Sequence, residues 1–279
     1  MQYKEAYAYG KRILEENNIA YAQWDARRLL EHICHINRGQ FVVWGEKKME
    51  EEEEEKYKKA IQERAAHRPL QYIVGSQEFM GLPFLVNEHV LIPRQDTECL
   101  VEEVLKKVQD EMAVLDLCTG SGCIILSIAH YKKNIMAKAS DVSPDALAVA
   151  RENKKRLGLD VQFVESDLFQ KIEGKYDVIV SNPPYIKKGE IGELMEEVRD
   201  YEPFCALDGG EDGLFFYRVI GKEARKYLKK GGWMFFEIGY DQREEVISIM
   251  EQYGYEDISS VKDLGGHNRI VYGKYGISS

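Results

Sequence analysis

The sequence predicts an α/β protein in which a doubly wound, mostly parallel sheet follows a small helical domain. Three observations lead to this prediction. Residues 1–68 carry apolar side chains at helical spacing only. From about residue 97, short apolar runs alternate with helical patterns, which is typical of parallel strands covered by helices on both faces. The chain has 279 residues, enough for one sizeable domain and a smaller one.

Residues 1–70 are expected to form the helical domain. Ala6, Tyr9 and Ile13 recur at helical spacing in a first helix. Asp25 is expected to cap a second helix. The acidic run Glu50–Glu55 opens a third helix, where negative charge suits the positive end of the helix dipole. We interpret that run as a solvated helix face.

Residues 71–92 are expected to connect the two domains as a β-hairpin. Pro69 ends the helical block, and short alternating runs follow it. The segment from Phe79 to Phe84 is typical of a hairpin that turns at Gly81. The main domain is therefore expected to span residues 93–279.

The main domain is expected to contain seven strands. Their predicted ranges are 114–117, 136–141, 161–164, 176–181, 233–237, 255–259 and 269–273. Helices are expected from about Thr97, around Ile124–Ala129 and over Pro144–Leu157, each beside a strand in the chain. This alternation predicts a Rossmann-like sheet with ligands bound beyond the carboxyl ends of its strands.

The distribution of charge argues against stable nucleic-acid binding. The net charge is −10. Residues 1–75 carry 13 basic and 13 acidic side chains, so the acidic excess lies in the rest of the chain, with 25 basic and 35 acidic. Proteins that grip a phosphate backbone usually show a basic footprint.

No membrane segment, disulfide framework or metal site is expected. No apolar run approaches the roughly 20 residues of a membrane span, and the N-terminus lacks the apolar core of a signal peptide. We therefore expect a cytoplasmic protein. The five cysteines are odd in number, and none lies in a Cys-x-x-Cys pair.

A glycine-containing turn follows the first strand of the main domain and opens a helix. It comprises Cys118, Thr119, Gly120, Ser121 and Gly122. The two glycines let the backbone come close to a ligand. No Lys-Ser/Thr pair follows them, so the turn is not a phosphate-binding P-loop. The alternative interpretation is an ordinary tight turn between a strand and a helix.

Acidic residues after the next two strands favour a nucleoside cofactor. Asp141 ends the second strand, 19 residues after Gly122, where an acid can accept hydrogen bonds from both hydroxyls of a ribose. This arrangement serves NAD and adenosyl cofactors alike. Asp167 is placed to accept from an adenine amino group, and Leu168 to provide an apolar wall. Each acid alone fits a loop or helix-cap carboxylate, but their order along the strands favours cofactor binding.

The fourth strand runs directly into a proline-rich corner, and this is the candidate reaction site. The corner comprises Asn182, Pro183, Pro184 and Tyr185. The Asn182 side-chain oxygen and the Pro183 carbonyl can accept the two N–H bonds of a planar NH₂ group. The nitrogen lone pair would then face a sulfonium methyl group in line, while Tyr185 offers a flat face to an amide or a base. A proline-rich turn without function is the alternative.

These motifs resemble the class I methyltransferases that act on amide or amino nitrogens, and most closely the release-factor glutamine methyltransferases of the HemK/PrmC type. The resemblance covers essentially the whole chain. The segments that carry it are His67–Ile73, Glu78–Leu82, Leu91–Glu98, Tyr201–Arg218 and Asp263–Arg269, besides the turn and the corner. Cys118 is a departure, because the family often has glycine there; we expect it to be tolerated.

The resemblance implies S-adenosylmethionine as cofactor and methylation of N5 of the glutamine in the Gly-Gly-Gln motif of peptide chain release factors, a step in translation termination. It implies that the helical domain docks the release factor and that Asn182–Tyr185 hold the glutamine amide. Cofactor contacts are implied for Cys118, Thr119, Gly120, Ser121, Gly122, Asp141, Asp167, Leu168 and Asn182. A monomer is expected.

Three alternatives compete with this interpretation. An adenine-N6 nucleic-acid methyltransferase uses the same corner, but normally brings a basic groove. A glutamine methyltransferase of a ribosomal protein carries similar loops, but lacks the Arg-x-Asp-Thr-Glu pattern found at Arg94–Glu98. A regulatory module that only binds the cofactor would not need Asn182–Tyr185.

Overall fold

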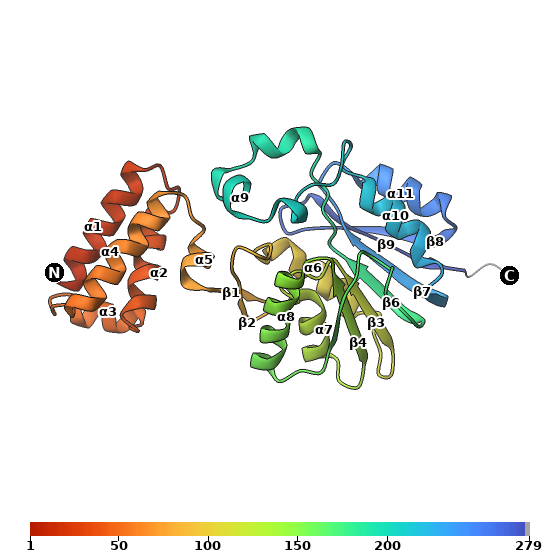
Figure 1. Ribbon diagram of the computed structural model, residues 1–279, viewed down its shortest axis with the longest axis horizontal. Helices are drawn as coiled ribbons and strands as arrows, with labels where there is room; N and C mark the ends of the chain where they lie inside the picture. Colours follow the sequence, from red (N-terminus) through yellow and green to blue (C-terminus); the bar gives the residue numbers. More distant parts are fainter. Residues whose placement is uncertain (277–279) are drawn as a thin grey trace. The chain divides into compact units, whose positions relative to one another are not determined.

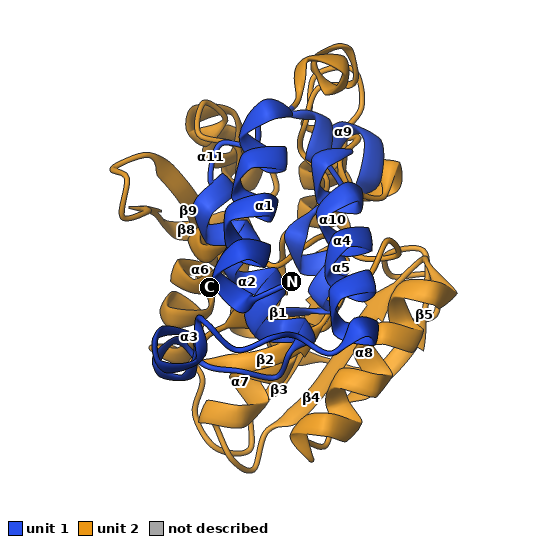
Figure 2. Ribbon diagram, turned by 90° about the vertical axis from the view of Figure 1, so that its left-hand side faces the viewer, with its two compact units in different colours: residues 1–76, 195–201 blue, residues 77–194, 202–279 orange. Residues whose placement is uncertain are grey.

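The computed structural model describes residues 1–276, which form two compact units (Figure 2). The first unit contains Met1–Ser76 and a short later segment, Met195–Tyr201. The second contains Gln77–Leu194 and the chain from Glu202 onward. The later segment of the first unit interrupts the sequence of the second. It could not be assigned from sequence, because it is seven residues long and carries no helical periodicity of its own.

The first unit is helical, as predicted. Its helices are α1 (Tyr3–Glu16), α2 (Ala22–Ile33), α3 (Arg38–Trp44), α4 (Glu51–Ala65), α5 (Leu70–Val74) and α9 (Glu196–Tyr201). Leu14, Leu29, Tyr57 and Ile61 are fully buried in its core. The acidic run opens α4, with Glu50 as its N-cap. Helix α3 was not predicted, because none of its residues is buried and its sequence therefore shows no apolar stripe.

Asp25 does not cap α2, so that prediction is wrong. The helix begins at Ala22, and Asp25 lies inside its first turn, buried. Its Oδ2 accepts a hydrogen bond of 2.7 Å from Nε of Arg64, which is also buried. Arg64 Nη2 lies 2.6 Å from Oε1 of Glu197 in the later segment. Arg64 therefore ties α2, α4 and α9 together inside the first unit.

A β-hairpin follows α5. Its strands are β1 (Ser76–Phe79) and β2 (Leu82–Leu85), and they turn at Met80-Gly81, as the sequence predicted. The single helical turn of α5 lies where an alternating pattern had been expected to begin.

The second unit contains a seven-stranded sheet with helices on both faces (Figure 1). The strands are β3 (Ala113–Leu117), β4 (Met136–Asp141), β5 (Gln162–Glu165), β6 (Tyr176–Ser181), β7 (Leu228–Glu237), β8 (Tyr255–Lys262) and β9 (Asn268–Tyr275), in the order β5-β4-β3-β6-β7-β9-β8. The pairs among the first five strands in this order are parallel, and β9 pairs antiparallel with both β7 and β8. The predicted doubly wound, mostly parallel sheet is confirmed.

Two apolar cores flank this sheet. The helices of the second unit are α6 (Gln95–Leu105), α7 (Cys123–Tyr131), α8 (Pro144–Leu157), α10 (Phe215–Ala224) and α11 (Arg243–Gln252), with short 3₁₀ turns at Lys188–Glu193 and Phe204–Ala206. Leu100 of α6 and Ile125 of α7 belong to one core, and Tyr217 of α10 and Val246 of α11 to the other. Strand β3 contributes to both, which explains why its sequence is an unbroken apolar run apart from Asp116.

The register of the sheet brings four strand ends to one edge. Leu117 pairs with Ser140 of β4 and with Ser181 of β6, and Ser181 pairs with Phe236 of β7. The loops that follow these strands are therefore neighbours, although they lie as far as 120 residues apart in the chain. No helix within residues 1–276 is both long and apolar enough to cross a membrane.

Candidate active site

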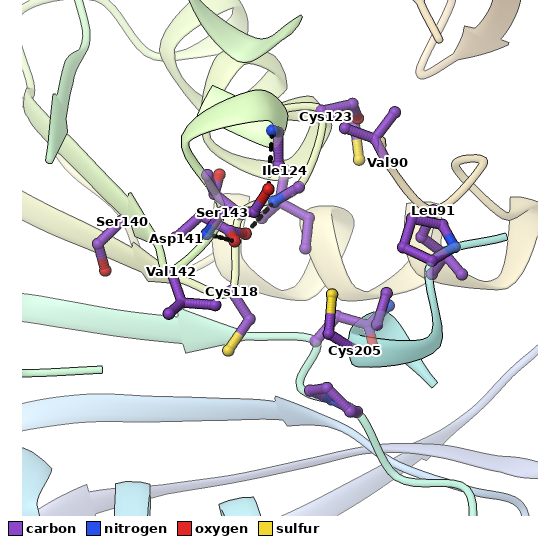
Figure 3. Close-up of a pocket in the computed structure, with 18 of the residues that line it drawn as sticks. Val90, Leu91, Cys118, Cys123, Ile124, Ser140, Asp141, Val142, Ser143 and Cys205 are labelled. Atoms are coloured by element: carbon purple, nitrogen blue, oxygen red, sulfur yellow. Dashed lines mark hydrogen bonds between the residues drawn. The ribbon is translucent and has the colours of Figure 1, made fainter. Parts of the chain in front are cut away.

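A cavity opens at the carboxyl edge of the sheet, entirely within the second unit. Its empty volume is about 970 Å³, including the open mouth. The predicted residues that line it are Cys118, Thr119, Gly120, Ser121, Asp141, Asp167, Leu168, Asn182 and Pro184. The structure thus brings the glycine turn, the two acids and the start of the proline corner to one hollow. Residues not predicted from sequence, among them Val90, Leu91 and Cys205, complete its wall (Figure 3).

The Asp141 carboxylate organises the glycine turn. Its Oδ2 accepts a 2.9 Å hydrogen bond from the backbone N–H of Gly120, and its Oδ1 accepts one of 3.0 Å from Ser143 (Figure 3). Burial raises the pKa of this carboxyl group, and the backbone donors partly offset the effect. A carboxylate has about four acceptor positions. The N–H groups of Gly120, Ser143 and Val142 use part of this capacity, and Asp141 can still accept from hydroxyls of a ligand.

Two predicted residues of the turn have conformations that only the structure reveals. Cys118 has φ +59°, in the left-handed region that glycine adopts without cost. Gly122 does not line the cavity. A Cβ added to it would lie 3.0 Å from Leu126 and 3.2 Å from Ala150, so Gly122 allows the start of α7 to pack closely against its neighbours. Its contribution to a ligand site is indirect.

Asp167 and Leu168 line the cavity on another side. Asp167 is exposed, and its Oδ2 accepts a 2.8 Å hydrogen bond from Gln170. Leu168 has φ +45°, an unusual value for a residue with a side chain. The Ser166 hydroxyl donates a 2.9 Å hydrogen bond to its carbonyl and holds this bend in place.

The proline corner leaves the sheet beside the glycine turn. The Ser181 hydroxyl donates a 2.8 Å hydrogen bond to the Leu117 carbonyl, which ties the end of β6 to the end of β3. Asn182 and Pro184 line the cavity, whereas Pro183 and Tyr185 do not. Both prolines are buried, and Tyr185 is half-buried. Burial raises the pKa of Tyr185 to about 12, so its hydroxyl stays protonated near neutral pH.

Gln242 holds Tyr185 from behind, a role that sequence reasoning missed. Its Nε2 donates hydrogen bonds to the carbonyls of Tyr185 at 2.9 Å and Gly213 at 3.2 Å, and its Oε1 accepts from Gly239 at 2.9 Å. A Cβ added to Gly213 would lie 2.5 Å from the Tyr185 carbonyl oxygen. Gly213 and Gln242 therefore fix the backbone at the end of the corner. A glutamine just before a helix was the available sequence signal.

Glu237, at the end of β7, lies behind Asn182 and was also missed. It is 2% exposed. Burial raises the pKa of its carboxyl group to about 7, and hydrogen bonds from Thr97 and Asn182 partly counteract this. Burial likewise raises the pKa of Asp116, at the end of β3, to about 7. A strand-end acid in an otherwise apolar run was the sequence signal for Glu237.

Two family models and several known proteins match this chain. The family model described as the PrmC N-terminal domain matches residues 5–75, and the one described as the methyltransferase small domain matches residues 95–198. The chain is 42% identical to the release factor glutamine methyltransferase of Clostridium acetobutylicum over 97% of this chain and 98% of that protein. It is 40% identical to that of Geobacter sulfurreducens over 94% and 93%.

The chain belongs to the release factor glutamine methyltransferase family. A methyltransferase from Pyrococcus furiosus has the same fold: its crystal structure superposes with a TM-score of 0.53 at 19% identity, over 71% of this chain and 90% of that one. Among residues 1–276, no group of three or more His, Cys, Asp or Glu side chains is arranged to hold a metal ion.

The cavity fits the adenosyl cofactor of a family of methyltransferases. Asp141 keeps acceptor capacity for hydroxyl groups of a ligand beside its backbone donors. The buried hydroxyl of Ser140, which lines the cavity, has no hydrogen-bond partner among the described residues. Polar groups left in this state inside a cavity are matched by a ligand or by water.

Proposed function

We propose that this chain transfers a methyl group from S-adenosylmethionine to N5 of the glutamine in the Gly-Gly-Gln motif of peptide chain release factors, in the cytoplasm. Membership of the release factor glutamine methyltransferase family carries the choice of substrate. The observation that carries the chemistry is the shared cavity. Asn182 lines the same cavity as Asp141 and the glycine turn, so a planar NH₂ group of the substrate and the cofactor would meet there.

Each of the proposed cofactor residues would contact a different part of the cofactor. Asp141 would accept from the ribose hydroxyls with the acceptor capacity that its backbone donors leave free. Asp167 would accept from the adenine amino group, and Leu168 would cover the ring. The backbone of Cys118–Ser121 would approach the cofactor closely, because the turn bends through left-handed conformations at Cys118 and Gly120. S-adenosylmethionine supplies an electrophilic methyl group on a sulfonium when bound.

The corner would position the substrate. An amide nitrogen is a poor nucleophile, because its lone pair is delocalised. The Asn182 Oδ1 and the Pro183 carbonyl would each accept one of its N–H bonds, and Tyr185 would stack on the amide plane. Held in this way, the lone pair points at the methyl carbon, and positioning supplies most of the rate acceleration. The nitrogen becomes more acidic as the methyl group is transferred, so its proton can leave late without a strong base.

The helical first unit would dock the release factor, with residues 1–70 as the docking domain, 71–92 as the connector and 93–279 as the methyltransferase domain. Residues 5–75 match the N-terminal domain described for this family, which supports a distinct role for them. A monomeric enzyme without stable nucleic-acid binding remains our prediction.

Transfer of labelled methyl groups tests the proposal. Purified enzyme is incubated with labelled S-adenosylmethionine and a release factor, the Gln→Ala variant of its Gly-Gly-Gln motif, or duplex DNA. We expect label in the first substrate only. Asn182→Ala should abolish the transfer and leave cofactor affinity within about threefold, because the Asn182 side chain grips the substrate amide. Label in the motif variant or in DNA would refute the assigned substrate, and equal loss of transfer and cofactor affinity would refute the role of Asn182.

A further inference from the structure

The two ends of the Asn182 side-chain amide are not equivalent for the proposed reaction. A substrate NH₂ group donates hydrogen bonds, so it needs the Oδ1 end of Asn182. Rotation of the amide by half a turn would present Nδ2, and two donors would then face each other. The residue behind Asn182 therefore decides whether the site can hold its substrate.

Two side chains lie behind Asn182. Its Nδ2 donates a 3.4 Å hydrogen bond to Oγ1 of Thr97, at the start of α6. The second is Glu237, which follows Phe236, the β7 residue that pairs with Ser181. Hydrogen bonds from Thr97 and Asn182 lower the pKa of Glu237, whereas its buried Oε2 has no hydrogen-bond partner among the described residues. Thr97 and Glu237 are each only 2% exposed, so water does not compete freely for these contacts.

The direction of these hydrogen bonds depends on Glu237. An ionised carboxylate only accepts, so the single hydroxyl proton of Thr97 points to Glu237 and its lone pair accepts from Asn182 Nδ2. Asn182 Nδ2 is then occupied by Thr97, and Asn182 Oδ1 remains for a ligand. A protonated Glu237 can donate to Thr97 instead. The hydroxyl is then free to donate to Oδ1 of a rotated Asn182.

Charged and titratable groups surround Glu237 on several elements. Arg269 of β9 favours its ionised form, whereas Asp96 of α6 disfavours it. Tyr185, Tyr217 of α10 and Cys123 of α7 are also within electrostatic reach. Arg269 is itself held by Asp263 at 3.1 Å and Asp96 at 3.3 Å, so its charge is shared among three acids.

We propose that Glu237 is the positioning residue of the reaction corner: through Thr97 and directly, its carboxylate holds the Asn182 amide with Oδ1 toward the substrate. The proposal rests on the proposed function, because it assumes that a substrate N–H bond is the partner of Oδ1. Glu237 acts through Asn182 and needs no contact with substrate or cofactor.

The test compares Glu237→Ala, Glu237→Gln and Thr97→Val in methylation of a release factor. Glu245→Gln, which removes an exposed carboxylate from α11, is the matched control. Loss of a hydrogen bond to a charged group predicts a kcat about 10- to 100-fold lower for Glu237→Ala, with the cofactor Kd changed less than about threefold. Glu237→Gln should lose activity as well, because its side-chain NH₂ group can donate to Thr97 as the protonated acid does. Thr97→Val should lose less, because Glu237 can still hold Asn182 directly.

The pH profile separates positioning from a general structural role. With a pKa of about 7 for Glu237, the kcat/KM of the wild type should fall as the pH drops below about 7. In Glu237→Gln this acidic limb should disappear, because an amide does not titrate.

Three results would overturn the proposal: full activity of Glu237→Ala, full activity of Glu237→Gln, or an acidic limb that persists unchanged in Glu237→Gln. Absence of release-factor methylation by the wild type would instead refute the proposed function.

Discussion

Replacement of Asp141 by alanine tests the cofactor assignment most directly. The wild-type carboxylate accepts backbone hydrogen bonds from Gly120 at 2.9 Å, from Ser143 at 3.0 Å and from Val142, and it lines the cavity, where it can also accept from a ligand. Alanine removes all of these acceptor positions. The site then loses its ribose acceptors, and the glycine turn loses the anchor that holds its N–H groups.

The expected magnitude follows from the number of contacts. A hydrogen bond to a charged group is worth about 1.5–3 kcal/mol. Two bonds to the ribose would give about 3 kcal/mol at the low end of that range, or a cofactor Kd roughly 100-fold weaker. Asp141→Asn should not restore binding, because its NH₂ group would face the N–H of Gly120 or of Ser143, and two donors would then oppose each other.

Titration calorimetry with S-adenosylhomocysteine, the demethylated product, measures this affinity without turnover. Asp145→Ala is the control, since Asp145 is an exposed acid in the first turn of α8, close to Asp141 in the chain. We expect its Kd to stay near that of the wild type. An Asp141→Ala Kd within about threefold of the wild type would refute the ribose assignment.

Three further predictions concern the scaffold of the site and the first unit. Gly213→Ala should lower kcat/KM at least about tenfold, because the added Cβ displaces the Tyr185 carbonyl. Gly254→Ala is the control: it has a similar φ of +75° but no atom within 4 Å of the added Cβ, so it should lower stability only. Equal kcat/KM values for the two variants would contradict this. The melting temperature of Asp116→Asn minus that of the wild type should increase as the pH rises from about 4 to 8. Burial raises the folded-state pKa of Asp116 to about 7, so ionisation of Asp116 opposes folding. A melting-temperature difference that does not depend on pH would refute this explanation. Arg64→Met should lower the unfolding free energy of the first unit by about 3–5 kcal/mol, because it leaves the buried Asp25 carboxylate without its ion-pair partner. A loss below about 1 kcal/mol in denaturant titration would argue against a structural ion pair.

Residues that act through local patterns were predictable from sequence. The strands of the sheet read as apolar runs, and the predicted ranges of β4, β6 and α8 agree with the structure at both ends. The proline corner and the glycine turn follow buried strands directly, so a parallel sheet had to bring them to one edge. Helix α3 was not predicted, because it buries none of its residues. Asp25 was assigned wrongly, because a helix cap and a buried ion pair use the same residue type.

The sequence by itself determined the sheet and brought the glycine turn, the two acids and Asn182 to one edge of it, because hydrophobic patterning and strand ends are local signals. Only the tertiary structure decided which side chains support these residues. Glu237 and Gln242 lie more than 50 residues from the corner that they support, and strand register rather than sequence spacing puts them there. Hydrogen-bond direction and burial in a low-dielectric interior depend on neighbours from several strands, so neither can be read from one segment of chain.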